Sequence, residues 1–365
     1  MTMLPTIEQR IDQGQALTRD EALFLLREVD LLTLGRLADE VRKRRHPDGQ
    51  VSFVVDRNVN YSNVCCCKCR FCAFYCDEDD DQAYLLSYDE IFAKVQELVD
   101  HGGTQLLMQG GVHPSLTIDW FEELFRQLTE RFPMVQIHSL SPAEITQIAH
   151  LSGLTLRECL QRLQQAGLKS IPGGGAEVLV DEVRKAISPN KIGWRQWAEV
   201  MEVAHELGMK TTATMMFGSC DTEEQRVEHL FRVREIQEKH GGFSAFISWS
   251  FQPTNTELGG ETATGQDYLK ILALSRLVLD NIDNIQASWV TQGAHMAQVA
   301  LRFGANDLGG TMLEENVVAA AGVSFRMTQQ ELVELARQAG FTPVRRTTGY
   351  DVLEVYEGPL KKDEA

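Results

Sequence analysis

The eight residues 65–72 concentrate the most reactive side chains of the chain. They read Cys-Cys-Cys-Lys-Cys-Arg-Phe-Cys, and Cys65, Cys69 and Cys72 give a C-x3-C-x2-C spacing with Phe71 before the last thiol. Three thiolates this close in sequence can converge on one soft metal centre. A structural zinc site requires four ligands, usually as two pairs, and no second pair follows. The spacing therefore predicts a [4Fe–4S] cluster on three thiolates, with one iron open for a further ligand.

Three further thiols lie beside this motif. We expect Cys66, Cys67 and Cys76 to be spectators, because the spacing selects the other three. Two simpler interpretations stay open on spacing alone: a redox-active or structural thiol cluster, and a zinc site that takes a ligand from elsewhere in the chain. An intracellular cysteine cluster is usually metal-binding or catalytic, which favours the metal centre.

Composition restricts the class of protein. The chain has 365 residues, 43% of them hydrophobic, which is enough for the core of one barrel-sized domain. Its formal net charge of −17 repels phosphate backbones and anionic lipid, so nucleic acid is not an expected partner. No apolar run is long enough for membrane insertion, and the N-terminus lacks the features of a secretory signal. Clustered thiols without such a signal predict a cytoplasmic protein.

The apolar pattern first predicts helices and then alternates. Residues 1–50 show helical spacing, with a capping box at Thr18 and Glu21, and residues 51–61 form a strand that leads into the cysteine loop. Further strands are predicted over 104–109, 134–139, 168–171, 209–216, 244–250 and 284–288. Further helices are predicted over 87–101, 117–131, 155–166, 194–207, 223–239, 264–280 and 292–303.

This alternation predicts an α/β fold, a TIM-like (β/α) barrel with its helices outside. The alternative is an open doubly wound sheet, but the chain has neither a Gly-x-Gly-x-x-Gly segment after the first strand nor a Walker motif. We expect an N-terminal helical extension over 1–50, a barrel core over 51–325, and a C-terminal helix and hairpin over 326–365. The hairpin is expected over 343–357, with a frayed tail at 361–365.

Two glycine-rich segments follow predicted strands, where the active residues of a parallel barrel lie. Gln109-Gly110-Gly111 ends the strand after the cysteine loop, and its glycines allow a ligand to approach the backbone closely. A run of three glycines, 173–175, precedes Glu177, whose carboxylate could accept hydrogen bonds from ribose hydroxyls. The structural alternatives are a plain turn and a carboxylate that favours a helix start.

As a whole the chain resembles the radical S-adenosylmethionine (SAM) superfamily, and within it the futalosine-pathway branch. Its pattern is similar to that of the dehypoxanthine futalosine cyclases, also called cyclic dehypoxanthinyl futalosine synthases, over nearly the full length. The segments that carry the resemblance are residues 56–64, 72–75, 107–114, 139–145, 171–177, 212–218, 251–257, 287–293 and 302–311.

Two sibling families share much of this pattern. Aminofutalosine synthases usually carry Val-Gly-Gly at the position of Gln109-Gly110-Gly111. The hydroxybenzyl-transferring subunit of deazaflavin (FO) synthase carries Gly-Thr-Ala-Ala-Glu where residues 173–177 read Gly-Gly-Gly-Ala-Glu. The combination in this chain favours the cyclases. Cys76, the acidic run 77–81 and Ser248 depart from the family pattern and bear on substrate contacts.

The resemblance implies two cofactors and one protein partner. The [4Fe–4S] cluster would be held by Cys65, Cys69 and Cys72, and its open iron would bind SAM. The residues implied for SAM binding are Phe71, Ala73, Phe74, Gln109, Gly110, Gly111 and Glu177. An electron donor such as flavodoxin or ferredoxin is implied as the partner.

The implied reaction is a step of menaquinone biosynthesis, the cyclisation of dehypoxanthine futalosine. A 5′-deoxyadenosyl radical would abstract the hydrogen at C4′, the carbon radical would add to the benzoate ring, and loss of one electron and one proton would restore aromaticity. Candidate catalytic residues are Glu314, Asp307 and His113, with Glu315 and His138 as further possibilities; Arg302, Asn306 and Thr311 are candidates for binding the substrate carboxylate. A non-enzymatic iron–sulfur sensor or scaffold remains the alternative outside the enzymes.

Overall fold

The centre of the protein is one eleven-stranded sheet. The computed structural model describes residues 3–323 and 325–359, so the tail expected at 361–365 lies outside the described residues. The strand order is β11-β10-β1-β9-β8-β7-β6-β5-β4-β3-β2, and all neighbours are parallel except β10 and β11. The strands are β1 (Gln50–Val54), β2 (Asp56–Val59), β3 (Gln105–Met108), β4 (Gln136–Ser139), β5 (Leu168–Ile171), β6 (Lys210–Phe217), β7 (Phe243–Ser250), β8 (Asn284–Gln286), β9 (Asp307–Gly310), β10 (Thr342–Arg346) and β11 (Val352–Val355).

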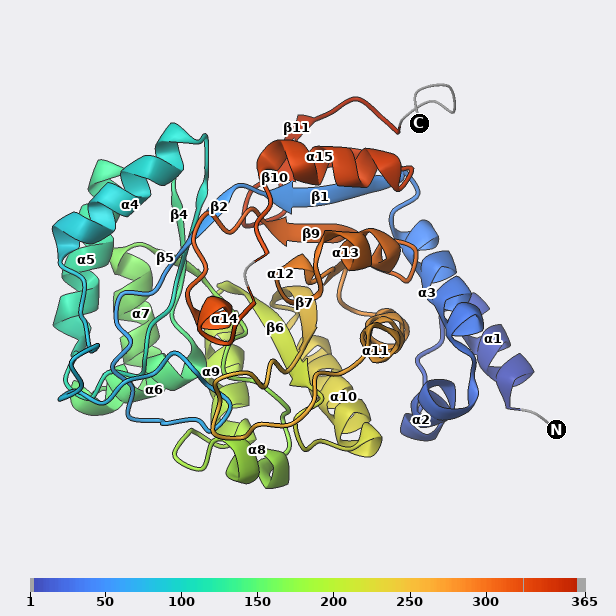
Figure 1. Ribbon diagram of the computed structural model, residues 1–365, viewed down its shortest axis with the longest axis horizontal. Coiled ribbons are helices and arrows are strands. Elements are labelled where there is room, and N and C mark those ends of the chain that lie inside the picture. The colour runs from blue at the N-terminus through green and yellow to red at the C-terminus, as the bar shows by residue number, and fades with distance from the viewer. Residues whose placement is uncertain (1–2, 324, 360–365) are drawn as a thin grey trace.

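The segment 50–59 belongs to both sides of this sheet. Its first part, β1, pairs with β9 and β10, whereas its second part, β2, pairs with β3. The sheet therefore curls until its two sides meet at this segment (Figure 1). The chain changes partners at Val55, so the strand predicted over 51–61 is two strands. The TIM-like α/β barrel predicted from the alternating pattern is confirmed.

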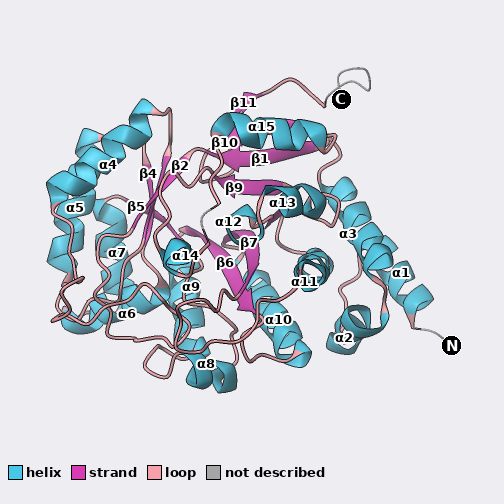
Figure 2. Cartoon of the chain, viewed as in Figure 1, coloured by secondary structure: helices cyan, strands magenta, loops and turns pink. Residues whose placement is uncertain are grey.

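Helices surround the curled sheet (Figure 2). Those that follow the strands are α4 (Tyr88–Asp100), α5 (Ile118–Arg131), α6 (Pro142–Leu151), α7 (Leu156–Ala166), α8 (Asp181–Ile187), α9 (Trp194–Glu206), α10 (Glu223–His240), α11 (Gly265–Val278), α12 (Trp289–Gln292), α13 (Ala294–Ala300), α14 (Val317–Ala320) and α15 (Gln329–Gln338). Many begin at a capping box; the Ser87 side chain, for example, accepts from the Glu90 N–H. Such local signals explain why most predicted helix starts match.

The N-terminal extension is helical, as predicted. It contains α1 (Leu4–Asp12), α2 (Arg19–Glu28) and α3 (Leu31–Arg45), and α2 begins with the expected capping box of Thr18 and Glu21. Helix α3 packs on α11 and α2 packs on α10, so the extension covers helices of the barrel. The division of the chain at residues 50 and 325 stays a prediction.

Several local features differ from the expected pattern, among them helix α8, which lies outside the predicted helix ranges. The helix predicted over 292–303 is broken at Gly293, whose φ of +81° cannot continue a helix, and residues on its two sides form α12 and α13. Helix α6 was not predicted, although Ser141 and Glu144 form a capping box at its start. No helix in the described parts of the chain is long and apolar enough to cross a membrane.

Candidate active site

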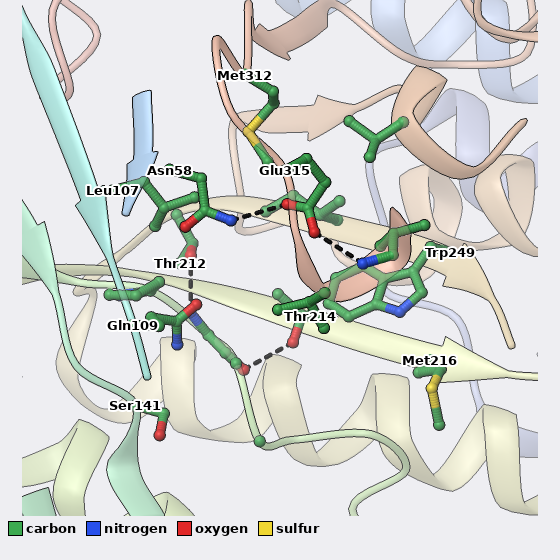
Figure 3. A pocket seen from close by; sticks show the side chains of 18 of the residues that line it. Asn58, Leu107, Gln109, Ser141, Thr212, Thr214, Met216, Trp249, Met312 and Glu315 are labelled. Atoms are coloured by element: carbon green, nitrogen blue, oxygen red, sulfur yellow. Dashed lines mark hydrogen bonds between the residues drawn. The ribbon is translucent and has the colours of Figure 1, made fainter. Parts of the chain in front are cut away.

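A cavity of about 450 Å³ extends from the inside of the barrel to the cysteine loop. Barrel interiors of this type are usually filled by branched apolar side chains. Here many of the inward positions are polar or small, and this leaves the space. Such lining residues include Asp56, Gln105, His138, Ser170, Thr212, Ser244, Gln286 and Gly309. Figure 3 shows side chains from several strands pointing into the cavity.

The cysteine loop connects β2 to α4 and forms one end of the cavity. Cys65, Cys69 and Cys72 line the cavity, and Cys69 is 5% exposed. The backbone N–H of Val112 donates a hydrogen bond to the Cys65 sulfur at 3.3 Å. The Cys66 N–H in turn donates to the Val112 carbonyl at 2.9 Å, so hydrogen bonds tie the cysteine loop to the segment after β3.

The donor set fits a cluster that uses three thiolates. Within the described residues, no three His, Cys, Asp or Glu side chains converge tightly enough to hold a single metal ion. In a cubane each thiolate binds a different iron, so its three ligands need not meet at one point. The three extra thiols do not line the cavity: Cys66 is exposed, Cys67 is buried in a cluster with Cys69 and Val112, and the Cys76 sulfur accepts a hydrogen bond from Asn63.

The two glycines after Gln109 allow the cysteine loop to lie against the end of β3. A Cβ at Gly111 would be 2.1 Å from the carbonyl oxygen of Val64, and one at Gly110 would be 2.7 Å from the Tyr61 ring. Both distances are shorter than the contacts that real Cβ atoms make, so only glycine fits at these two positions. The sequence predicted that a ligand approaches these glycines closely. In the structure, it is the loop carrying the predicted cluster that packs against them.

Glu144 joins this strand end to the cysteine loop. One carboxylate oxygen accepts hydrogen bonds from the Tyr61 hydroxyl at 2.7 Å and from the Gly110 N–H at 3.1 Å. Burial raises the pKa of Glu144 to about 7, although these donors act against it. Glu144 lines the cavity and was not identified from the sequence. Its sequence signals are its place in the capping box of α6 and in the segment 139–145 that carries the family resemblance.

Glu177 lies in the cavity wall with a cation beside it. Its backbone is left-handed, with a φ of +43°, and its carboxylate is 2.5 Å from the Lys191 ammonium. Burial alone would raise the pKa of Glu177, but the charges of Lys191 and Arg184 outweigh it and hold the pKa below its ordinary value. Lys191 also lies 5.1 Å from the centre of the Phe71 ring. Lys191 was missed, because a single lysine in a loop carries no pattern.

The residues predicted to bind SAM lie together. Phe71, Ala73 and Phe74 line the cavity beside the three cysteines, and so do Gln109, Gly110, Gly111 and Glu177. The two glycine-rich segments meet, since a Cβ at Gly174 would be 2.6 Å from Nε2 of Gln109. Their role in binding SAM stays a prediction.

The three predicted catalytic residues are not part of the described lining. Asp307 forms an ion pair with Arg346 at 2.6 Å and accepts a hydrogen bond from Ser52. Glu314 pairs with Arg57 at 2.8 Å and with Lys94 at 2.7 Å. His113 accepts a hydrogen bond from the Ser115 N–H. Nothing tests their role in the reaction, so the three stay predictions.

The candidates for the substrate carboxylate also have partners within the protein. Arg302 donates to the Ala339 carbonyl at 2.5 Å, and Asn306 accepts from Arg276 at 2.6 Å. The Thr311 hydroxyl donates to the Asp56 carbonyl at 3.1 Å. None of the three lines the cavity; the cations that do, among the described residues, are Lys191 and Arg346.

Other titratable groups do line the cavity. Burial raises the pKa of Asp56 to about 6. Burial and the charge of Arg346 lower the pKa of His138 to about 3, so its imidazole is neutral and shares a 2.6 Å hydrogen bond with Ser170. Glu315 accepts hydrogen bonds of 2.8 Å from the Asn58 side chain and from the Val318 N–H, and burial raises its pKa.

Comparisons with known proteins match both halves of the chain. The model of the radical SAM superfamily matches residues 59–233, and that of the CofH/MqnC C-terminal region matches residues 240–358. The FeFe-hydrogenase maturase HydG from Carboxydothermus hydrogenoformans has the same fold, with a TM-score of 0.74 at 17% identity over 95% of this chain and 80% of that chain. With the barrel and its cysteine loop, these matches define a radical SAM enzyme.

Relatives of similar length narrow the family. A cyclic dehypoxanthine futalosine synthase of Halalkalibacterium halodurans is 44% identical over 96% of this chain and 95% of its own length. A cyclic dehypoxanthine futalosine synthase of Streptomyces coelicolor is 42% identical over 98% of this chain and 90% of its own length. A 5-amino-6-(D-ribitylamino)uracil–L-tyrosine 4-hydroxyphenyl transferase of Methanococcoides burtonii is 40% identical over 95% of this chain and 99% of its own length. The chain belongs to this radical SAM family of synthases and transferases.

Proposed function

We propose that this enzyme cyclises dehypoxanthine futalosine. The observation that carries the proposal is the 44% and 42% identity, over nearly the whole chain, to two proteins with the name of that synthase. The combination of Gln109-Gly110-Gly111 with the glycine run at 173–175 supports it. The alternative is the transferase reaction, because the archaeal relatives are 40% identical over a similar length.

We propose that Cys65, Cys69 and Cys72 hold a [4Fe–4S] cluster and that SAM binds beside it. When bound, the reduced cluster supplies the electron that cleaves SAM to a 5′-deoxyadenosyl radical. Gln109, Gly110 and Gly111 offer backbone groups near this end of the cavity, and Glu177 offers a carboxylate oxygen to the ribose hydroxyls. A one-electron donor such as flavodoxin or ferredoxin is the proposed partner, in the reducing cytoplasm that free thiols require.

The cavity has two tasks in this reaction. Its walls must hold C4′ of the substrate next to the cysteine end, because hydrogen transfer requires near contact of the two carbons. They must also keep the benzoate ring within bonding distance of C4′ and exclude water and reductant from the radicals. The apolar side chains in the lining, among them Trp249, Met216 and Met312, are suited to a planar ring, whereas the polar strand positions can bond to hydroxyls.

The experiment compares three substrate sets. The protein is reconstituted anaerobically with iron and sulfide, given SAM and dithionite, and incubated with dehypoxanthine futalosine, with an enolpyruvyl benzoate, or with tyrosine and the ribityl uracil. We expect a cyclic product from the first set only, identified by mass spectrometry. With substrate deuterated at C4′, deuterium should appear in 5′-deoxyadenosine. Turnover of either other set without the first would refute the proposal, and a protein that forms no 5′-deoxyadenosine would be a sensor or scaffold.

A further inference from the structure

We propose that Glu315 is the base that takes the ring proton in the last step of the cyclisation. This inference rests on the proposed function and names the group that completes it. The neighbour of Glu315 in the sequence, Glu314, carries the same carboxylate but does not line the cavity, whereas Glu315 does.

The step requires a base because of its atom balance. Addition of the C4′ radical forms a carbon–carbon bond and leaves the attacked ring carbon with four single bonds, one of which is to its hydrogen. The unpaired electron is then spread over the ring. Aromaticity returns when the C–H bond breaks: the proton passes to the base, and the electron passes to a one-electron oxidant of the class of an oxidised iron–sulfur cluster. A positioned base typically contributes about 10²–10⁴-fold to such a step.

Glu315 reaches the cavity from a strap, residues 312–321, that follows β9. Met312, Glu315 and Val318 of the strap line the cavity, and Figure 3 shows Glu315 pointing toward Asn58 within it. The carboxylate accepts one hydrogen bond at each oxygen, 2.8 Å from Nδ2 of Asn58 and 2.8 Å from the backbone nitrogen of Val318. Each oxygen retains a second lone pair, so the group is oriented and can still accept a proton.

Access distinguishes Glu315 from the other carboxylates of the described lining. Asp56 and Glu144 are each 2% exposed, and Glu177 is 4% exposed. Glu177 is also paired with Lys191, and Glu144 is occupied by donors from the cysteine loop and α6. Glu315 is the least buried of these four lining carboxylates, so it is the most accessible of them to a substrate.

Basicity points the same way. Burial raises the pKa of Glu315, which makes it a stronger proton acceptor than an ordinary glutamate. Glu314 has two cations, Arg57 and Lys94, within 2.8 Å, and although burial acts in the other direction they hold its pKa below the ordinary value. His138 has too low a pKa, about 3, to take up a proton readily. Of the two adjacent glutamates, the structure therefore favours the second.

A structural role for Glu315 would predict different behaviour. The Asn58 contact ties the strap to β2, as the contact between the Asn255 side chain and the Ala320 carbonyl, at 2.9 Å, ties it to the loop after β7. If the tie were all that mattered, Asn58→Ala would have the same effect as loss of the carboxylate. Glu315→Gln separates the two roles, because glutamine keeps the size and an accepting oxygen but cannot take the proton.

The test measures cyclic product and 5′-deoxyadenosine in the same reconstituted samples with C4′-deuterated substrate. For Glu315→Gln we expect deuterium transfer to persist while the product formed per 5′-deoxyadenosine falls about 100-fold. Glu315→Asp should recover part of that ratio. Glu314→Gln should keep the wild-type ratio within about twofold, and Asn58→Ala, which removes one of the two contacts that orient Glu315, should lower the ratio less than Glu315→Gln does. Calorimetric titration of the as-isolated proteins with substrate should give dissociation constants within about threefold of one another.

Each contrary result has a distinct meaning. A wild-type ratio in Glu315→Gln would overturn the inference and leave the proposed function intact. A fall in Glu314→Gln alone would transfer the role to that residue, and a fall in Asn58→Ala with a wild-type ratio in Glu315→Gln would show a tether. If Glu315→Gln fails to fold, a ratio in Glu315→Asp no lower than wild type, with Asn58→Ala reduced, would refute the base. A wild-type protein that leaves the substrate unchanged would overturn both proposals.

Discussion

Six thiols lie within twelve residues of the chain, and the three proposed ligands line the cavity whereas the other three do not. Cys69 faces the cavity and is 5% exposed, whereas Cys66 is exposed on the outside of the loop. We predict that Cys69→Ala loses at least half of the iron per chain after anaerobic reconstitution, because one of three ligands is gone. Cys66→Ala should keep the wild-type content. Iron and sulfide assays measure both, and loss of iron in Cys66→Ala would show that the wrong thiols were chosen.

The pair of Lys191 and Glu177 is the second prediction at this scale. Their charged atoms are 2.5 Å apart, and their side chains are 11% and 5% exposed. Lys191→Met would remove the ion-pair partner that the buried carboxylate has among the described residues, which typically costs about 3–5 kcal/mol of unfolding free energy. The double variant Lys191→Met/Glu177→Gln should regain much of that loss, because no unpaired charge remains. Urea denaturation of the as-isolated proteins checks this, and additive losses would refute the coupling.

At the scale of the elements, the end of β3 packs directly against the cysteine loop, and no space is left for a side chain at Gly111. An alanine at Gly111 would place its Cβ 2.1 Å from the Val64 oxygen, and a backbone atom cannot move aside as a side-chain tip can. We predict that Gly111→Ala displaces the loop, lowers iron content to below half of wild type, and costs about 1–3 kcal/mol. Gly349→Ala is the matched control, since its nearest neighbour would be 3.5 Å away. Wild-type iron content in Gly111→Ala would contradict the argument.

For the whole molecule, buried titratable groups in the barrel set the pH dependence of stability. Burial raises the pKa of Asp56 to about 6, against the donor Met312 N–H and the charge of Arg346, which lower it. An unfolded aspartate titrates near 3.9. The folded protein thus binds this proton more tightly, so the stabilising contribution is complete below about pH 4 and is lost as the pH rises through about 6.

The corresponding experiment compares Asp56→Asn with wild type. Asparagine has no charge to bury, so at pH 7.5 the variant should gain stability relative to wild type, and this advantage should shrink by roughly 2–3 kcal/mol by pH 4.5. Denaturation at a series of pH values measures the difference. Buried neutral histidines, such as His138 with its pKa of about 3, destabilise both proteins in acid and cancel in the comparison. A difference that does not change with pH would exclude Asp56 as the cause.

Patterns that lie close together in the sequence predicted much of this protein. Capping boxes, strand–helix alternation and the two glycine-rich segments are local signals, and they led to the barrel, the helix starts and the segments that meet around the cysteines. The predicted hairpin near the C-terminus is β10 and β11, which pair in antiparallel fashion. Gly293 shows a limit of such signals, because its left-handed backbone breaks a continuous helical pattern. A Cβ added at Gly293 would lie 3.2 Å from the ring of Phe325, which is distant in the sequence.

The sequence by itself determined which chemistry the chain can support, because cysteine spacing and glycine positions act over a few residues. Tertiary structure decided which groups meet. Glu314 and Glu315 are indistinguishable in sequence, yet one pairs with Arg57 and Lys94 and the other faces the cavity. Lys191 lies 14 residues from Glu177 in the sequence and Arg346 lies 39 residues from Asp307, and both pairs meet only when the chain folds. Direction and burial of a side chain depend on contacts distant in sequence, and those contacts form only in the folded barrel.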